Sequence, residues 1–480
     1  MEPHMRLTSL LLAALSVPLI SLFPTSAILA APPEVRGTWI TTTANDAISS
    51  PARTEETMRR LREIGLNTVY VECWKNGYTE FPSETMKRTV GIAMRVNGQD
   101  AIQRDLLAES VIQAHRNGLL CVAWFEYGFM AAFKDTTNEL RAKKEWMTVA
   151  ADGSDIGKKN GFAWLNPFHP EVQQFLIDIS LDAIKAYDLD GIQLDDRIAL
   201  PVDLGYDDYT RALYKKETGK DVPSDFKDPA WMQWRADKIT DFSLRYVTEL
   251  RAARPELIIS VSPAPFPWSY ENYLCDWMQW TRWCYCGGKR WNEYVPQTYR
   301  MDGPATIKSI QEQIDLIGDE KVSLVPGIRV VGDGPDLKFD DLKNVIEFTR
   351  KQELAGHVLW FSRGVLDLYP NELKQFYDVE NKGAASNPFK AGDWRPLPIV
   401  ATRGEGNAWK ANVKQAGRYR VIAKASGSSS EAKGSSTAAS GSSSEASGSW
   451  SEVSTLDLKV GEHTIVQDAE ALELLIDRRP

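Results

Sequence analysis

Short apolar runs alternate with amphipathic helical patterns along most of the chain after the first 34 residues. The helical segments carry boundary signals, such as Thr54 as a cap and Gly65 as a stop, and the hydrophobic period changes between elements from 3.6 to 2 residues. Asp105 and Gly118 are predicted to bound a second helix, and Pro170 to begin a third. The eight predicted strands begin near Val35, Leu66, Leu119, Leu189, Leu257, Glu293, Val322 and His357.

Repeated β-α units predict a parallel sheet covered by helices. Eight units within about 350 residues fit a (β/α)8 TIM barrel with long loops, in which the loops after the strands form the active site. An open doubly wound sheet is the alternative, but no glycine-rich dinucleotide-binding fingerprint follows the first strand. We therefore expect an α/β barrel over residues 32–382.

The hydrophobic pattern changes after Lys382. Strand patterns at 418–422, 456–465 and 472–476 predict a small β-sandwich-like module over residues 383–480. The Gly- and Ser-rich tract at 426–449 interrupts it, and the motif GSSSEA occurs twice within this tract. We expect a disordered loop there, because Gly and Ser bury too little apolar surface to offset the entropy lost on ordering.

The first 31 residues have the layout of a secretory signal peptide. Arg6 precedes an apolar run at 7–23, and the small residues Ala30 and Ala31 follow it. Cleavage would leave the mature protein in the periplasm or outside the cell, with no attachment to the membrane. An uncleaved anchor is the alternative, because the apolar run is close to the length of a membrane span.

Composition narrows the class of protein. The 480 residues include 56 Lys and Arg against 65 Asp and Glu, and the resulting net charge of −9 argues against nucleic acid as a partner. Charged residues make up 25% and hydrophobic residues 43%, which excludes a disordered chain or a multi-span membrane protein. The 16 Trp residues suit both core packing and stacking on sugars. Five Cys exclude a disulfide-dense scaffold, and no pattern indicates the oligomeric state.

Several chemical motifs are absent from the sequence. It contains no HExxH zinc motif, no GxSxG elbow, no phosphate-binding GxxxxGK loop and no CxxC pair. Only five His are present, so we expect neither a metal site nor a cofactor. The chemistry that remains at the predicted strand ends is that of carboxylates.

The segment DGIQLDDR at 190–197 is the most informative of these strand ends. Residues of a barrel strand face the lumen and the helices alternately. Ile192 and Leu194 are apolar and should face the helices, which places Gln193 in the lumen and Asp195 at its mouth.

A carboxylate at that mouth suits a nucleophile, a stabiliser of the transition state or a metal ligand. The alternative is a structural role, in which Asp195 caps the next helix or pairs with Arg197. Asp196 points away from the lumen or belongs to the loop, and it is the weaker catalytic candidate.

Two more acids end the second and third predicted strands. Glu72 and Glu126 could each lie across the mouth from Asp195, and glycosidic cleavage requires two carboxylates. Trp124 and Tyr127 give Glu126 a partly apolar setting that raises the pKa of a carboxyl group, as a general acid needs. The alternative for each Glu is a salt bridge that holds the barrel together.

Aromatic and polar residues near the predicted strand ends are candidate sugar contacts. They are Trp39, Trp74, Trp124, Tyr127, Gln193, Arg197, Trp268, Gln297, Tyr299 and Arg300.

Six segments, taken together, resemble one family. They are VRGTWIT at 35–41, NTVYVECWKNGYTEFPS at 67–83, AWFEYGFM at 123–130, WLNPFHPEVQQF at 164–175, DGIQLDD at 190–196 and PQTYR at 296–300. In this order they resemble the bacterial glycosyl-hydrolase-like barrel family, which includes the divisome-localised glycosyl hydrolase of Gram-negative bacteria. Cyanobacterial forms are the most similar.

The resemblance implies a (β/α)8 barrel, a location in the cell envelope and hydrolysis of a glycan, which in at least one relative is that of peptidoglycan. Asp195 also resembles the nucleophile of the distantly similar α-amylase clan. The fifth strand, however, ends in Ser262 and Pro263 without an acid, so the acid/base residue of that clan cannot be transferred. Arg197 replaces the His or aromatic residue of many relatives, and the segment 283–289 is unusual, which leaves the fine specificity open.

The sequence therefore favours an exported glycoside hydrolase that acts on a polysaccharide by a two-carboxylate mechanism. A glycan-binding or envelope scaffold protein that has lost catalysis is the main alternative. A metal-dependent hydrolase using Asp195 and Asp196 is a third interpretation, and the shortage of His disfavours it.

Overall fold

The computed structural model describes residues 31–95, 104–158, 160–282, 284–285, 288–289, 291–379, 384–390, 399–413, 417–425, 450–466 and 471–478. The expected leader, apart from its last residue, lies outside these ranges, as do the Gly- and Ser-rich tract and the boundary at 382 and 383. Those three expectations stay predictions.

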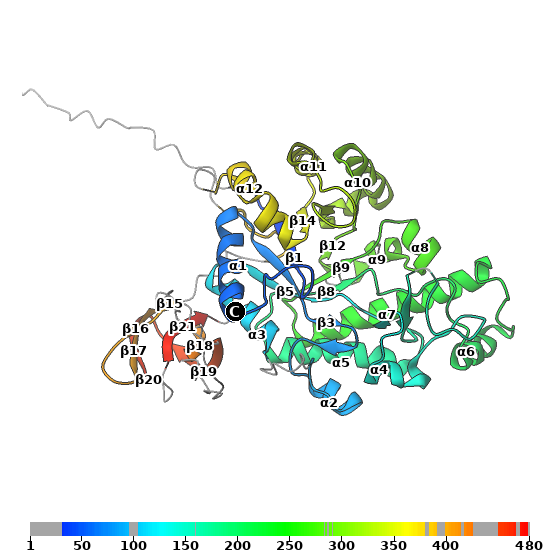
Figure 1. Ribbon diagram of the computed structural model, residues 1–480, viewed down its shortest axis with the longest axis horizontal. Coiled ribbons are helices and arrows are strands. Elements are labelled where there is room, and N and C mark those ends of the chain that lie inside the picture. Colours follow the sequence, from blue (N-terminus) through cyan, green and yellow to red (C-terminus); the bar gives the residue numbers. More distant parts are fainter. Residues whose placement is uncertain are drawn as a thin grey trace, which may run out of the picture.

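Eight parallel strands form the core of the molecule (Figure 1). They follow the order β12-β9-β8-β5-β2-β1-β14-β13, and bridges from Tyr294 to Leu324 and from Gln297 to Gly327 join the two outer strands. The sheet is therefore closed, and the predicted TIM-barrel fold is confirmed. The strands are β1 (Val35–Ile40), β2 (Thr68–Glu72), β5 (Leu120–Phe125), β8 (Gly191–Asp195), β9 (Ile258–Ser262), β12 (Glu293–Tyr294), β13 (Gly327–Arg329) and β14 (Gly356–Trp360).

Helices surround the barrel, and short strands extend its loops. The helices are α1 (Pro51–Ile64), α2 (Glu84–Val90), α3 (Leu106–Arg116), α4 (Glu139–Ala142), α5 (Pro170–Ala186), α6 (Asp208–Thr218), α7 (Pro229–Ala253), α8 (Trp268–Tyr273), α9 (Trp277–Thr281), α10 (Gly303–Ile317), α11 (Phe339–Lys351) and α12 (Pro370–Tyr377). The loop strands are β3 (Trp74–Lys75), β4 (Tyr78–Thr79), β6 (Met130–Phe133), β7 (Phe162–Trp164), β10 (Cys284–Tyr285) and β11 (Gly288–Lys289).

Helix boundaries follow the sequence signals closely, with one correction. Thr54 does not cap α1: the side chain of Ser50 accepts a hydrogen bond from the backbone N–H of Arg53, and Pro51 begins the helix one turn earlier than predicted. Thr54 is buried in the first turn. Gly65 ends the helix as predicted, because its φ of 111° lies in the left-handed region that glycine adopts without strain.

The start of the seventh strand also differs from the prediction. Val322, the predicted start, lies in a 3-10 helix at Gly318–Ser323, and regular pairing begins only at Gly327 in β13. Three residues form this strand, and the apolar residues before it contribute an isolated bridge, from Leu324 to Tyr294.

The described part of the C-terminal region forms two antiparallel sheets, β15-β21-β18-β19 and β16-β17-β20. The single strand predicted at 456–465 is wrong, because β19 ends at Leu458 and β20 begins at Gly461, whose φ of 134° breaks the extended run. The strands are β15 (Ile399–Val400), β16 (Thr402–Arg403), β17 (Ala408–Val413), β18 (Gly417–Ala425), β19 (Trp450–Leu458), β20 (Gly461–Val466) and β21 (Ala471–Arg478).

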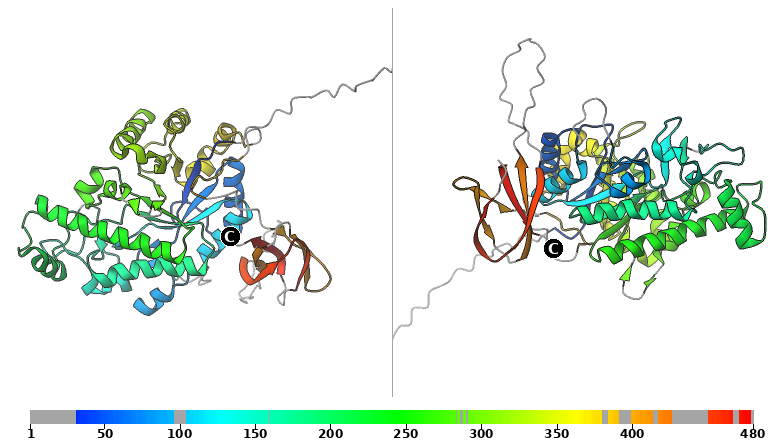
Figure 2. Two further views of the ribbon diagram at one scale, coloured as in Figure 1. Left: turned by 180° about the vertical axis from the view of Figure 1, so that it is seen from behind. Right: turned by 90° about the horizontal axis from the view of Figure 1, so that it is seen from below.

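These sheets lie beside α1 and α3, at one side of the barrel (Figures 1 and 2). Ile112 of α3 shares a buried apolar cluster with Ile422 and Leu475 of the sheets. Arg420 of β18 is also within hydrogen-bond distance of His115 in α3. Apolar and charged contacts together attach the sheets to the barrel. Among the described residues, no helix is long and apolar enough to cross a membrane.

Candidate active site at the carboxyl ends of the barrel strands

Gln193 reaches across the barrel lumen. Its side-chain oxygen accepts a hydrogen bond from Trp39 Nε1 of β1 at 2.7 Å, and its amide nitrogen donates to Ser260 Oγ of β9 at 2.9 Å. Strands β1 and β8 are not neighbours in the sheet, so the bond to Trp39 crosses the interior. The lumen-facing orientation predicted for Gln193 is confirmed.

A layer of aromatic rings fills the lumen above this contact. Trp39, Trp124 and Trp360 pack against one another with ring centroids 5.8 to 6.3 Å apart. Tyr299 meets Trp39 edge-on at 6.5 Å. Trp39 and Trp124 are each only 1% exposed, so they form the floor of the mouth. Direct stacking of these two on a sugar, as predicted, would require the layer to open.

Asp195 lies at the end of β8, and several donors surround its carboxyl group. Trp124 Nε1 donates to Oδ2 at 3.0 Å, the backbone N–H of Asp196 donates to Oδ1 at 2.7 Å, and Gln297 Nε2 donates to the same oxygen. The guanidinium of Arg197 lies 3.2 Å from Oδ2. Each of these partners stabilises the ionised carboxylate.

Arg197 links the acids of this region. Its Nη1 pairs with both Asp195 and Asp196, and its positive charge also acts on Glu126. The side chains of Asp196 and Arg197 are 27% and 25% exposed, whereas that of Asp195 is 2% exposed. The expected structural alternative, pairing of Asp195 with Arg197, is therefore present in the structure. It leaves the catalytic role of Asp195 as a prediction.

Glu72 and Glu126 form a second acidic group around Lys75. Lys75 Nζ lies 2.6 Å from Glu72 and 3.3 Å from Glu126. Glu72 also accepts hydrogen bonds from the backbone N–H and the hydroxyl of Thr42, and it is hydrogen-bonded to Glu126. Ion pairs were the structural alternative for both acids. The structure contains both ion pairs. The side chain of Glu126 is 15% exposed, whereas that of Glu72 is fully buried.

The strand register brings Glu126 next to Asp195. Phe125 of β5 pairs with Leu194 of β8, so the following residues of the two strands lie at the same level. Neighbouring strands are about 4.8 Å apart, and side chains alternate between the two faces. Trp124 contacts Asp195 in the lumen, and Glu126, two residues further along, belongs to the same face. The two predicted catalytic carboxyls therefore come from adjacent strands.

The electrostatics of the two groups differ. Burial raises the pKa of Asp195 to about 8, and the charge of Arg197 opposes that rise. Burial and the negative charge of Glu72 raise the pKa of Glu126 well above its usual value. Burial would also raise the pKa of Glu72, but its hydrogen bond to Glu126 and the charge of Lys75 lower it overall. The arrangement thus keeps a proton on Glu126 beside an ionised Glu72.

Other predicted sugar contacts are closed to solvent. Trp74 is fully buried, donates to the carbonyl of Gly128 at 3.0 Å and packs on Phe175 at a centroid distance of 5.8 Å. Tyr127 is 5% exposed. These residues support the loops around the mouth, and a direct sugar contact for them stays a prediction.

Trp268 is the most open of the predicted aromatic contacts. It is 49% exposed and packs on Tyr273 with centroids 5.4 Å apart. Burial, followed by the negative charge of Asp196, raises the pKa of Tyr273 to about 12, so Tyr273 lies close to the acids. Arg300 is exposed as well. Trp268 therefore offers a free aromatic face near the acidic group.

The sequence analysis missed Lys75, Thr42 and Tyr273. Lys75 follows Glu72 by three residues. It lies in β3 of the short hairpin β3–β4, where its side chain forms an ion pair with Glu72. Its place directly after the second strand was a usable signal. Tyr273 lies in α8 and carries no comparable signal, because only the fold brings it near Asp196.

The described residues contain no group of three or more His, Cys, Asp and Glu side chains that could hold a metal ion. Asp195 and Asp196 share Arg197, and a cation at this position would have to displace its guanidinium.

Two named relatives match part of this chain. "Glycosyl hydrolase YngK" from Bacillus subtilis is 24% identical over 243 residues, which are 48% of this chain and 45% of the relative. "Glycosyl hydrolase DigH" from Escherichia coli is 24% identical over 213 residues, which are 42% of this chain and 45% of the relative. The chain thus spans less than half the length of each of these relatives.

A solved structure with a similar fold is the glycoside hydrolase domain of PgaB (BpsB) from Bordetella bronchiseptica. The TM-score is 0.53 at 14% identity, over 72% of this chain and 99% of that domain, and this likeness shows the fold alone. The sequence model of the family described as glycosyl hydrolase-like 10 matches residues 34–330, more than half of the sequence, and the chain therefore belongs to that family.

Proposed function

We propose that the protein is an exported glycoside hydrolase that cleaves glycosidic bonds in a polysaccharide of the cell envelope, such as the glycan strands of peptidoglycan. The observation that carries the proposal is the backbone register that brings Asp195 and Glu126 to the same level at the ends of adjacent barrel strands. Two flanking carboxyl groups are what this reaction needs. The predicted signal peptide and the names of the relatives support the location and the substrate class.

In this proposal the two acids have separate tasks. Glu126 holds a proton because of its burial and the negative charge of Glu72, and it donates this proton to the oxygen of the leaving sugar. Asp195, once ionised, stabilises or attacks the anomeric carbon. Its donors from Trp124 and Gln297 fix the carboxylate in one orientation.

The exposed rim supplies the contacts to the chain of sugars. Trp268 offers an aromatic face on which the apolar side of a sugar ring can stack. Arg197 and Arg300 offer hydrogen-bond donors to sugar hydroxyls near the acids.

A second candidate function is glycan binding without catalysis. The observation that favours it is the 2% exposure of Asp195 beneath its contacts with Arg197 and Gln297. A non-catalytic protein would bind cell-wall sacculi to the same extent with Asp195→Asn, and it would release no product.

The test is digestion of a panel of cell-wall and storage glycans with the mature protein in ¹⁸O-labelled water, followed by mass analysis. Hydrolysis places one ¹⁸O atom in each new reducing end. We expect labelled products from at least one glycan, and a loss on the order of 10³-fold or more in rate for a folded Asp195→Asn variant. Failure of every glycan to yield labelled ends would reject the proposal, and unlabelled products would indicate a non-hydrolytic cleavage.

A further inference from the structure

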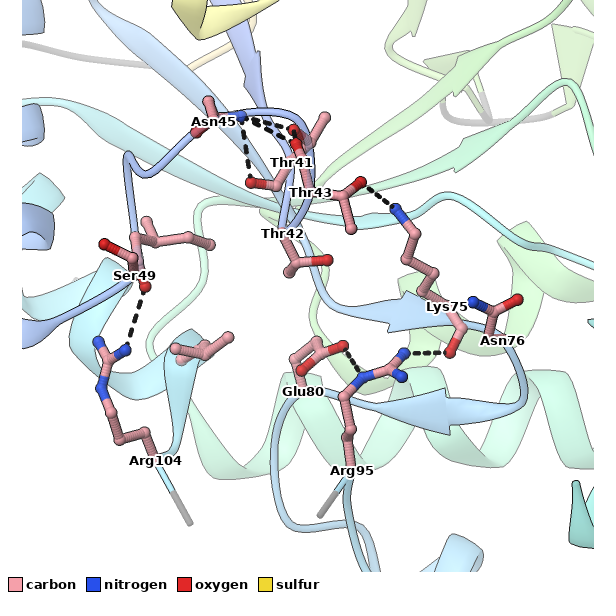
Figure 3. A pocket seen from close by; sticks show the side chains of 12 residues that line it. Thr41, Thr42, Thr43, Asn45, Ser49, Lys75, Asn76, Glu80, Arg95 and Arg104 are labelled. Carbon is pink, nitrogen blue, oxygen red and sulfur yellow. Dashed lines mark hydrogen bonds and ion pairs between the residues drawn. The ribbon is translucent and has the colours of Figure 1, made fainter. Parts of the chain in front are cut away.

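A polar pocket lies beside the Glu72–Glu126 pair and is not used by the chemistry described above. Its volume is about 270 Å³, and it lies between the loop after β1 and the hairpin β3–β4 (Figure 3). Thr42 in its wall donates to Glu72, and Lys75 in its wall contacts both acids. Neither acid lines the pocket, so a molecule in it would be one side chain away from the proposed general acid, on the other side of Lys75.

The wall is built mainly from hydroxyl, amide and charged side chains. Figure 3 shows the turn at Thr41 to Asn45 opposite Glu80 and Arg95, with Lys75 to one side. Among the described residues, Ile48 and Leu106 are the apolar side chains of the lining. The aliphatic parts of these side chains are exposed in the pocket as well, so the wall matches a ligand that combines hydroxyl groups with apolar C–H faces.

Contacts within the wall hold these side chains in place before any ligand arrives. Asn45 Nδ2 donates to Thr41 Oγ1 at 2.7 Å, and Lys75 Nζ donates to Thr43 Oγ1 at 3.1 Å. Arg95 pairs with Glu80 at 2.5 Å. Fixed donors and acceptors reduce the entropy that binding a small polar ligand would cost.

The charges of the wall are balanced. Lys75 pairs with Glu72, Arg95 pairs with Glu80, and Arg104 pairs with Glu109 at 3.1 Å through its Nε atom. Each of these cations already pairs with an acid, and a carboxylate or sulfate ligand would have to compete with that acid. The pocket therefore suits a neutral ligand.

We propose that this pocket is a subsite for one neutral, hydroxyl-bearing sugar ring of the glycan, adjacent to the bond on which Glu126 acts. The inference rests on the proposed function only for the position of the ring next to the cleaved bond. The volume lies just below the roughly 300 to 1,000 Å³ of pockets for drug-sized ligands, so it suits a single ring and not a longer stretch of sugar chain.

The test uses the mature protein and three probes, which are the methyl glycosides of glucose, N-acetylglucosamine and glucuronic acid. Saturation-transfer NMR should detect at least one neutral glycoside, with a dissociation constant on the order of 1 mM. Thr43→Trp and Ser49→Trp each place a large ring at an exposed position of the wall, and each should weaken this binding at least tenfold. Thr248→Trp, at an exposed position of α7, is the matched control and should bind as the wild type does.

Three results would overturn the inference. They are tighter binding of the glucuronide than of either neutral glycoside, unchanged binding by both Trp variants of the wall, and no binding of any probe. Circular dichroism of each variant establishes that it is folded. Sugar binding without hydrolysis of any glycan would support the subsite and contradict the proposed hydrolase function. Full hydrolytic rates in Thr43→Trp and Ser49→Trp would support the hydrolase function and contradict the subsite.

Discussion

Two aspartates flank the same barrel strand, β8, and meet opposite surroundings. Asp190, just before the strand, is fully buried and lies 2.7 Å from His115 and 3.2 Å from Lys390, and it accepts a hydrogen bond from the backbone N–H of Cys121. Asp195, at the other end, shares one partly exposed cation with Asp196. The charge of Asp190 at the closed end is thus compensated by several partners, whereas burial raises the pKa of Asp195 at the mouth.

Glu34 extends this contrast to a second strand. It precedes β1 and pairs with Arg36 at 2.5 Å and Arg350 at 2.7 Å. Burial alone would raise the pKa of Glu34, but the hydrogen bond from Arg350 and nearby positive charges lower it to about 2. The pKa of Asp195 is instead raised to about 8. Glu34 is thus held as a carboxylate that stabilises the fold, whereas the raised pKa of Asp195 is typical of a functional site.

The sharpest test of the mouth compares Glu126→Gln with the isosteric Glu72→Gln. Loss of a general acid should slow hydrolysis of a polysaccharide by about 10²- to 10⁴-fold, and the loss should shrink for an aryl glycoside, whose leaving group needs no proton. Glu72→Gln should show the same dependence on the leaving group with a smaller loss, because Glu72 acts through the pKa of Glu126. Steady-state kinetics on the two substrates decide the assignment. An equal loss on both substrates for Glu126→Gln would remove it as the acid.

Substitution of an acid at the closed end of the barrel should change the stability of the fold. Glu34→Gln is expected to lower the free energy of unfolding by about 3 kcal/mol at pH 7, because Arg36 and Arg350 lose their shared acid. Since the folded pKa lies below the unfolded value of 4.5, this stability is complete above pH 4.5 and is lost as the pH falls towards 2. Urea unfolding of both proteins at pH 7 and pH 3 measures it. A difference as large at pH 3 as at pH 7 would contradict this linkage.

Activity should depend on pH through Asp195. If this residue acts as a carboxylate, kcat/KM rises with pH through about 8. Arg197→Gln should move this limb upward by about one pH unit, because the guanidinium opposes the rise in the pKa of Asp195. A pH-rate profile of each protein measures the shift. A limb that stays in place in Arg197→Gln would show that another group controls it.

The smallest expected effect is on the stability of the mouth itself. The folded pKa of Asp195 is above its unfolded value of 3.8, so ionisation destabilises the fold increasingly between pH 4 and pH 8. Asp195→Asn should therefore raise Tm by a few degrees at pH 8 and by less at pH 5. Differential scanning calorimetry measures both. A lower Tm at pH 8 would place Asp195 with the stabilising acids.

Much of the fold could be predicted from the sequence because the barrel repeats one local pattern. Seven of the eight predicted strand starts lie within two residues of the observed ones. The eighth, at Val322, was misplaced because Val322 lies at the end of a mostly polar 3-10 segment, and the apolar residues after it precede the paired strand. The split between β19 and β20 was missed because Gly461 breaks a run that otherwise alternates as a strand does. The resemblance to a glycosyl-hydrolase-like barrel family is confirmed, whereas the similarity to cyanobacterial forms stays a prediction.

The site was harder to predict for a physical reason. The period of two places Gln193 and Asp195 in the lumen, and this can be deduced from Ile192 and Leu194 alone. The burial of Trp74 and the position of Lys75 between two acids depend on loops after the strands, whose paths no local pattern determines.

The most direct test measures the release of reducing ends by two variants of the same strand, Asp195→Asn and Asp190→Asn, from one susceptible glycan. Both are compared with the wild type at a temperature below the lowest Tm. The account predicts a loss on the order of 10³-fold or more for a stable Asp195→Asn and nearly full activity for a less stable Asp190→Asn. Retained activity in Asp195→Asn, or equal losses in both folded variants, would contradict it.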